Sequence, residues 1–160
     1  TSYEIASDRD ASNQWSWRVA IAPVVEDGPF SSLPGIDRQL VVVDGNGMLL
    51  EVDGSAVECL SGQVVSFSGD ATTSARLIDG PVIDVGLMTV NGLYAGSISV
   101  VTDVGSVIES DLIVAIGDTN LEDESGVHYR LETMDALLGV ERRRMVLLNG
   151  MAIAIQLKSL

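Results

Sequence analysis

Histidine, cysteine and positive charge are all scarce in this chain. Its 160 residues include one histidine, one cysteine and nine basic residues against 23 acidic ones, which gives a net charge of −14. A single cysteine forms no intramolecular disulfide, and a strongly negative chain is repelled by phosphate backbones and anionic lipid. The basic residues are scattered except for Arg142–Arg144, which we expect to solubilise a strand edge. We therefore expect a cytoplasmic protein that binds neither nucleic acid nor membranes.

Long apolar runs are also missing. No stretch approaches the roughly 20 apolar residues that span a bilayer, and no basic-then-apolar leader precedes the first expected strand, although the chain opens at Thr1 without a methionine. Hydrophobic residues nevertheless make up 46% of the chain, and the mean hydropathy is +0.31. This composition is sufficient for the core of one compact, soluble domain.

Turn signals recur about every eight to twelve residues, which is typical of an all-β protein. Asp53-Gly54 and Asn91-Gly92 are the best hairpin candidates, because Asp or Asn beside Gly supplies the positive φ that two-residue hairpins need. Only residues 132–138 could form a helix, and that helix would be short. The expected architecture is a sandwich or a closed barrel. The β-branched runs between turns predict strands at 17–25, 39–43, 48–52, 82–90, 93–101 and 112–116.

A faint internal repeat relates residues 76–83 to residues 146–153. Two similar β halves would follow, with residues 1–105 carrying a ligand pocket and residues 106–160 forming a degenerate second half within one compact unit. The alternative is a chance match in a sequence rich in Val, Leu and Gly. When the two copies are aligned, charged residues of the first copy match uncharged residues of the second. The aligned residues are Arg76, Asp79 and Asp84 in the first copy and Val146, Asn149 and Ala154 in the second.

The residues that metal or nucleophilic catalysis requires are few. A metal site needs three or four converging ligands, and His128 alternates with Arg130 on what we expect to be a solvated strand face. The acidic run 122–124 lacks the spaced Asp pattern of a cation-binding loop. No Gly-x-Ser-x-Gly motif is present, and Cys59 shares a strand face with Val57, so we expect it to be buried. We expect no metal, no cofactor and no catalytic residue.

Arg18 lies in a segment, 15–22, that alternates as a half-buried strand does. Trp17 falls on one face with other large residues, whereas Arg18 emerges on the other between Ser16 and Ala20. Small neighbours leave room for a ligand, and a guanidinium can fork onto a carboxylate. The alternative interpretation is a structural ion pair with an acidic side chain.

Arg38 follows a loop rich in Pro and Gly, residues 28–37, and leads directly into an expected strand. A rigid loop that holds an arginine at the mouth of a strand is a suitable anion clamp. Alternatively, an ion pair of Arg38 with Asp37 or Glu4 only pins the loop. Asp84 lies in an otherwise apolar strand, where it is either the buried partner of an arginine or an acceptor that faces a ligand.

Several segments together resemble the HutD/Ves family. Their order and spacing match through about residue 92, and the remainder fits as a weaker second half. The resemblance implies an all-β, cupin-like (RmlC-like) jelly roll, a double β-barrel or bicupin built from two repeats, without a metal. The matching segments are Glu4–Ala6, Trp17–Ala22, Asp27–Ser31, Pro34–Arg38, Gly45–Met48, Phe67–Asp70 and Asp84–Met88.

The resemblance also implies an association with bacterial histidine utilisation, in which HutD-type members act as regulators that bind a pathway intermediate such as urocanate or N-formylglutamate. Carried over by position, Arg38 corresponds to the ligand-facing arginine of the family, and Glu4, Arg18 and Asp84 surround the same cavity. This chain has Gly86 where the family commonly has Asn, which implies an altered pocket.

Two functions are weighed on these residues. The first is a non-catalytic, small-molecule-binding regulator, in which Arg38 and Arg18 hold a carboxylate ligand between apolar walls from Trp17 and Phe30. The alternative is a metal-free cupin-type isomerase or lyase that uses an acidic residue, Glu4 or Asp84, as its base. The expected partners are a small carboxylate ligand and, as a further option, a second copy of the chain in a homodimer.

Overall fold

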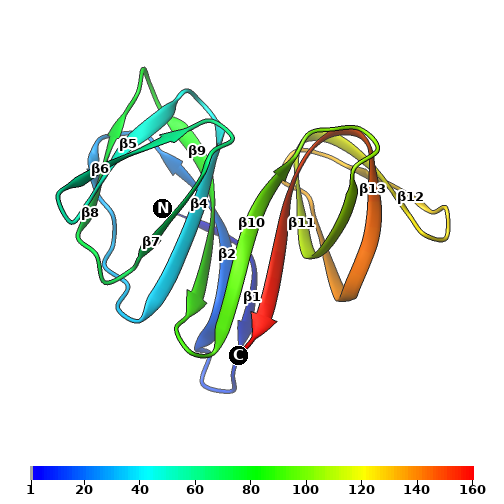
Figure 1. Cartoon of the computed structure of the whole chain (residues 1–160), viewed down its shortest axis with the longest axis horizontal. Helices are drawn as coiled ribbons and strands as arrows, with labels where there is room; N and C mark the ends of the chain where they lie inside the picture. Colours follow the sequence, from blue (N-terminus) through cyan, green and yellow to red (C-terminus); the bar gives the residue numbers. More distant parts are fainter. Residues whose placement is uncertain (1) are drawn as a thin grey trace. The chain divides into compact units, whose positions relative to one another are not determined.

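A computed structural model describes residues 2–160, except for the side chains of residues 140–143, so the expectation for Arg142 and Arg143 lies outside the described residues. The chain divides into two compact units, one with residues up to Gly96 together with 158–160, and one with residues 97–157 (Figure 1). The strands are β1 (Tyr3–Arg9), β2 (Trp15–Val24), β3 (Gly28–Pro29), β4 (Ile36–Asp44), β5 (Gly47–Val52), β6 (Ser55–Leu60), β7 (Val64–Ser68), β8 (Thr73–Leu77), β9 (Val82–Val90), β10 (Tyr94–Val101), β11 (Val107–Asp123), β12 (His128–Leu131) and β13 (Ala136–Ser159).

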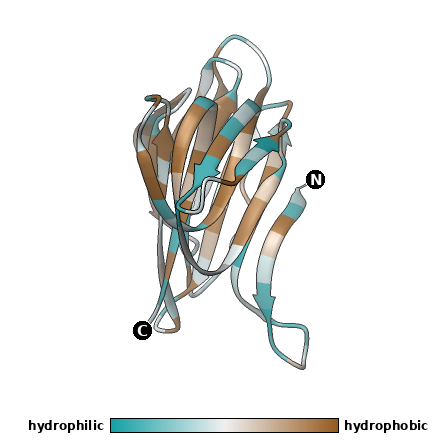
Figure 2. Ribbon diagram, turned by 90° about the vertical axis from the view of Figure 1, so that its right-hand side faces the viewer, coloured by the Kyte–Doolittle hydropathy of each residue, from teal (hydrophilic) through white to brown (hydrophobic). Residues whose placement is uncertain are grey.

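The first unit contains two antiparallel sheets. The larger has the strand order β1-β2-β9-β4-β7 and the smaller β3-β8-β5-β6. Hydrophobic and hydrophilic residues alternate along many strands, as the ribbon colours in Figure 2 show, because successive side chains of a strand point to opposite faces. Two sheets that interleave chain-distant strands in this way form a jelly roll.

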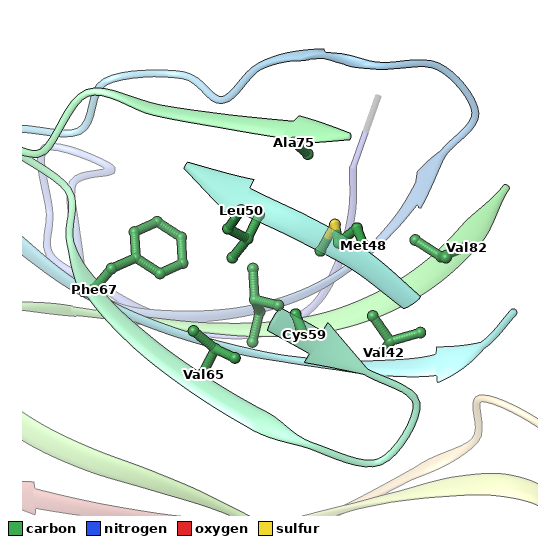
Figure 3. Close-up of a cluster of buried hydrophobic side chains, with 9 residues drawn as sticks. Val42, Met48, Leu50, Cys59, Val65, Phe67, Ala75 and Val82 are labelled. Atoms are coloured by element: carbon green, nitrogen blue, oxygen red, sulfur yellow. The ribbon is translucent and has the colours of Figure 1, made fainter. Parts of the chain in front are cut away.

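The core of this unit lies between its two sheets. Side chains from both sheets point toward one another in Figure 3, and Cys59 is fully buried among them, which confirms the expectation for this residue. Burying these side chains stabilises the unit by about 25 cal/mol for each Å² of apolar surface removed from water. The core consists of Leu40, Val42, Met48, Leu50, Cys59, Val65, Phe67, Ala75 and Val82.

The two hairpin predictions have different outcomes. Asp53 and Gly54 have φ values of 47° and 80° and join β5 to β6 with Val52 opposite Ser55, as predicted. Asn91 and Gly92 form a turn, but β9 and β10 are not neighbours in a sheet, so the second hairpin prediction is wrong. The reason is that β2 and β4 already occupy both edges of β9.

No closed barrel is found in the part of the chain that the structure describes. The larger sheet ends at β1 and β7, and the smaller at β3 and β6. An isolated bridge joins Val42 to Ser61, and otherwise side chains of the core fill the space between the sheets. The all-β jelly roll is therefore an open sandwich, which corrects the expectation of closure.

The segment 132–138 does not form the short helix that its sequence allows. Met134 has φ 71°, which a right-handed helix does not accommodate. Its amide donates to the Ala115 carbonyl, and the Asp135 carboxylate accepts from the Glu132 amide.

Among residues 2–160, no helix is long and apolar enough to cross a membrane.

The second unit is built around the two longest strands. β11 pairs with β13 and with β12, and β13 also borders β10. In β12, His128 is exposed, and its Nε2 lies 2.7 Å from Glu122 Oε2. Arg130 on the same face is also exposed, which confirms the solvated face. The core of this unit consists of Ile108, Ile113, Ala115, Leu121, Leu131, Met145, Leu147, Ala152 and Ala154.

Candidate functional site

A cavity of about 540 Å³ opens over the inner face of the larger sheet in the first unit. Its floor is a cross-strand row in which Ala20 of β2, Gly86 of β9 and Leu40 of β4 lie side by side. Two of these three residues have a small side chain or none. A Cβ added at Gly86 would find no atom closer than the Gln39 carbonyl oxygen at 3.7 Å, so the space above the glycine is open. The floor is therefore shallow and leaves room for a small molecule.

Two arginines enter this cavity from one neighbouring row. Arg18 of β2 and Arg38 of β4 both lie opposite Met88 of the central strand β9, and Phe67 of β7 is the next residue beyond Arg38. The strand alternation that the sequence predicts for Arg18 is thus correct. Pairing of β2 and β4 with the same strand brings together two arginines that are twenty positions apart in the chain, numbers 18 and 38.

The Arg38 side chain is held in place by aromatic rings. Its guanidinium carbon lies 5.2 Å from the centroid of the Phe30 ring and 4.9 Å from that of Phe67, and Nη1 donates a hydrogen bond to the Ser31 carbonyl at 3.1 Å. Burial lowers the pKa of Arg38 and the negative charge of Asp84 opposes this, but an arginine remains a cation. Within the described residues, Arg38 forms no ion pair, so the alternative interpretation, a structural pair with Asp37 or Glu4, is not observed.

Asp84 lies in the same cavity, between Ala22 of β2 and Val42 of β4 in a row beyond Gly86. The residue is only 6% exposed. Neither a hydrogen bond nor an ion pair reaches its carboxyl group from the described part of the chain. Burial raises the pKa of Asp84 to about 7, and the positive charge of Arg38 partly offsets the rise. Burial thus favours the protonated, uncharged form of the Asp84 carboxyl group.

Arg18 is already paired. Its Nε donates to Glu4 Oε2 at 3.0 Å, and the same oxygen also accepts from Arg9. A hydrogen bond from Ser7 is the main cause that lowers the pKa of Glu4, and Arg9 and Arg18 add to it. Glu4 does not line the cavity, and it therefore lies apart from the other predicted site residues. Its contact with the site is the hydrogen bond that positions Arg18. The structural interpretation of Arg18 is the one observed, although its side chain also borders the cavity.

The two predicted aromatic walls have different outcomes. Phe30 lines the cavity and contacts the ring of Phe67 at a centroid distance of 6.2 Å. Trp17 is buried but does not line the cavity. The expected wall from Trp17 is therefore corrected: Trp17 directly precedes Arg18 in β2, so strand alternation places it on the opposite face of the sheet.

Phe67 and Met88 are site residues that the sequence analysis missed. Met88 carries a local signal, because it follows Asp84 and Gly86 at two-residue spacing and so shares their strand face. Phe67 carries none, because its contact with Arg38 depends on the pairing of β7 with β4. That pairing joins segments that lie far apart along the chain.

The cavity offers a fixed cation and a buried acid. The cation suits binding of a carboxylate, and the acid suits either acceptance of a hydrogen bond or exchange of a proton. No three His, Cys, Asp or Glu side chains gather into a metal-binding cluster in the described part of the chain.

Sequence comparison identifies curated relatives of this chain. An uncharacterized 21.2 kDa protein in the hutC 3′ region of Pseudomonas putida is 36% identical over 75 residues, which cover 46% of this chain and 40% of that protein. Protein Ves of Citrobacter koseri is 31% identical over 88 residues, which cover 54% of this chain and 46% of Ves. The chain thus spans less than half the length of these curated relatives.

Comparison with solved structures also identifies a HutD protein as similar to this chain. HutD from Pseudomonas fluorescens SBW25, solved in a formate condition, superposes with a TM-score of 0.83 at 28% identity and covers 99% of this chain and 88% of its own. Salicylate 1,2-dioxygenase from Pseudaminobacter salicylatoxidans, at 9% identity and a TM-score of 0.60 over 90% of this chain and 75% of its own, shares the fold alone, which is the cupin fold. The HutD family model matches residues 1–157, and the chain belongs to the HutD family.

Proposed function

We propose that this protein is a non-catalytic regulator of histidine utilisation that binds a small carboxylate intermediate, urocanate or N-formylglutamate, in the cavity of its first unit. The observation that carries the proposal is Arg38, which lines the cavity and whose guanidinium has no carboxylate partner among the described residues. A carboxylate ligand supplies that partner. The genomic context of the Pseudomonas putida relative supports the pathway.

The environment of Arg38 favours tight anion binding. Its position between Phe30 and Phe67 and its hydrogen bond to Ser31 restrict the side chain before a ligand arrives, so less rotamer entropy is lost on binding. Charge-assisted hydrogen bonds contribute about 1.5–3 kcal/mol each. Arg18 contributes less to the affinity, because it already has a carboxylate partner in Glu4, which it shares with Arg9.

Thermal-shift and calorimetric titrations with urocanate and N-formylglutamate test this proposal. A ligand that binds only the folded protein raises its melting temperature, so one of the two acids is expected to stabilise the wild type. Arg38→Ala should abolish the shift. Arg76→Ala, which removes an exposed arginine of β8 outside the cavity, is the matched control and should leave the shift unchanged. Absence of any shift with both acids contradicts the proposal.

A metal-free isomerase or lyase is the second candidate, because the pKa of Asp84 is raised to about 7, near the value that suits a general base. Glu4 is a poorer base, since two arginines contact its carboxylate and its pKa is lowered. Incubation of each acid with the protein, followed by NMR, separates the two candidates. Consumption of the acid by the wild type but not by Asp84→Asn establishes the enzyme.

A further inference from the structure

We propose that the Asp84 end of the cavity selects the ligand, so that the protein takes small monocarboxylic acids that carry an N–H or O–H donor at the end opposite the carboxylate. This inference rests on the proposed function, because it assumes that Arg38 binds the carboxylate. It goes further in assigning a class of ligand and in making Asp84 the residue that determines specificity.

The spacing of the two groups defines the length of such a ligand. Arg38 lies opposite Met88, whereas Asp84 lies on the same face of β9 in the second row beyond it, with Gly86 between them. Asp84 Oδ1 is 3.9 Å from the position of a Cβ on Gly86, so the carboxyl group leans over the glycine toward the arginine row. The two rows together span roughly 13 Å along the strand. The Asp84 carboxyl group and the long Arg38 side chain shorten this gap, since their charges act on each other. A small molecule laid along the open floor therefore reaches both groups.

The chemistry of the buried carboxyl group requires a donor. An ionised carboxylate only accepts hydrogen bonds, and a protonated one still accepts through its second oxygen. The side chains nearest along the floor, those of Ala20, Ala22 and Leu40, have no polar atoms, and no hydrogen bond from the described residues reaches Asp84. Because Asp84 borders the cavity, a ligand N–H or O–H placed over Gly86 gives its carboxyl group a donor in either protonation state.

The same arrangement disfavours dicarboxylates, so of the two acids proposed above it favours urocanate, a monocarboxylate, over N-formylglutamate, which carries two carboxylates. A second carboxylate at this end would face Asp84, and two like charges in a buried site oppose each other. Arg38 does not relieve this repulsion, because the first carboxylate of the ligand already occupies it. A purely structural role for Asp84, as a distant counter-ion of Arg38, would affect stability but would not distinguish one acid from another.

Titration calorimetry with a matched pair of acids tests the inference. Urocanate carries an imidazole N–H, and 3-(2-furyl)acrylate has the same acrylate group on a ring of similar size without a donor. We expect the wild type to bind urocanate at least about ten-fold more tightly, a difference of about 1.4 kcal/mol. Asp84→Leu should bring the ratio of the two dissociation constants close to one. Arg38→Ala should weaken the binding of both acids by the same factor.

Asp84→Asn keeps an acceptor oxygen at nearly the same volume and guards against a folding defect in Asp84→Leu. It is expected to give a ratio between those of the wild type and the leucine variant, with circular dichroism confirming the fold of each. If the wild type binds both acids equally, or if Asp84→Asn and Asp84→Leu both keep its ratio, the selection by Asp84 is wrong while the carboxylate site stands. If neither acid binds the wild type, both proposals fail.

Discussion

Arg38 and Phe67 are cross-strand partners on β4 and β7, and the guanidinium carbon of Arg38 lies 4.9 Å from the centroid of the Phe67 ring. Phe30 approaches the same guanidinium from the loop that precedes β4, at 5.2 Å. The core of the first unit thus extends directly to Arg38, because Phe67 is also packed against the buried side chains of that core. A rigid core therefore restricts the movement of the Arg38 guanidinium.

Replacement of Phe30 should weaken ligand binding without unfolding the protein. A cation–π contact contributes about 0.5–1 kcal/mol at partly exposed sites, so Phe30→Leu is expected to raise the dissociation constant of a bound carboxylate by about two- to five-fold in calorimetry. Val25→Ala, at an exposed position that also lines the cavity, is the control and should have little effect. An unchanged affinity in Phe30→Leu would show that the ring does not hold the arginine.

Asp84 makes the protein less stable as the pH rises toward neutrality. Its pKa is about 7 in the folded state against an ordinary value of 3.8, so between these values the native state binds more protons than the unfolded state. The wild type therefore loses stability as the pH rises from about 3.8 to about 7. Asp84→Asn has no carboxyl group at this position, so its stability does not fall for this reason. As the pH rises through this window, the free energy of unfolding of Asp84→Asn, measured by urea denaturation, should increase relative to that of the wild type by up to about 4 kcal/mol. A difference between the two proteins that stays constant from pH 4 to pH 8 would contradict a raised pKa.

The loop before β4 depends on Gly69. Its amide donates to the Ile36 carbonyl at 2.7 Å, its carbonyl accepts from the Leu33 amide at 2.9 Å, and an added Cβ would overlap the Leu33 carbonyl oxygen. Gly69→Ala is expected to lower the free energy of unfolding by about 1–3 kcal/mol, the usual cost of overpacking.

Gly28→Ala is the matched control for this change. An added Cβ on Gly28 meets no atom within 4 Å, and neither glycine has a left-handed φ, so only the steric clash differs between the two variants. The control should change the unfolding free energy by less than about 0.5 kcal/mol in the same urea titration. Equal effects of the two substitutions would rule out the clash as the cause.

The two arginines of the cavity should contribute unequally. Arg18 forms an ion pair with Glu4, which it shares with Arg9, whereas Arg38 has no carboxylate partner in the described part of the chain. We expect Arg18→Ala to raise the dissociation constant of a bound acid by less than about three-fold, and Arg38→Ala to raise it by more than about ten-fold. Glu4→Gln should tighten binding, since it frees the charge of Arg18. A larger loss in Arg18→Ala than in Arg38→Ala would reverse the assignment.

Local patterns predicted a large part of this structure. The Asp53-Gly54 turn, the burial of Cys59 and the exposed face of His128 follow from spacing two residues apart or from adjacent turn residues. The same two-residue spacing predicted that Arg18 would face away from Trp17. These features depend on the pleat and the turn, and both are decided within a few residues.

Strand order, in contrast, was decided only by tertiary structure. β9 lies between β2 and β4, so the chain after Asn91-Gly92 leaves the sheet instead of returning as a hairpin. The same order brings Arg18, Arg38 and Asp84 into one cavity. The sequence by itself determined which face of each strand carries these side chains. Only the packing of the whole jelly roll decided which strands became neighbours, because burial of the shared core stabilises one set of pairings among many that local patterns allow.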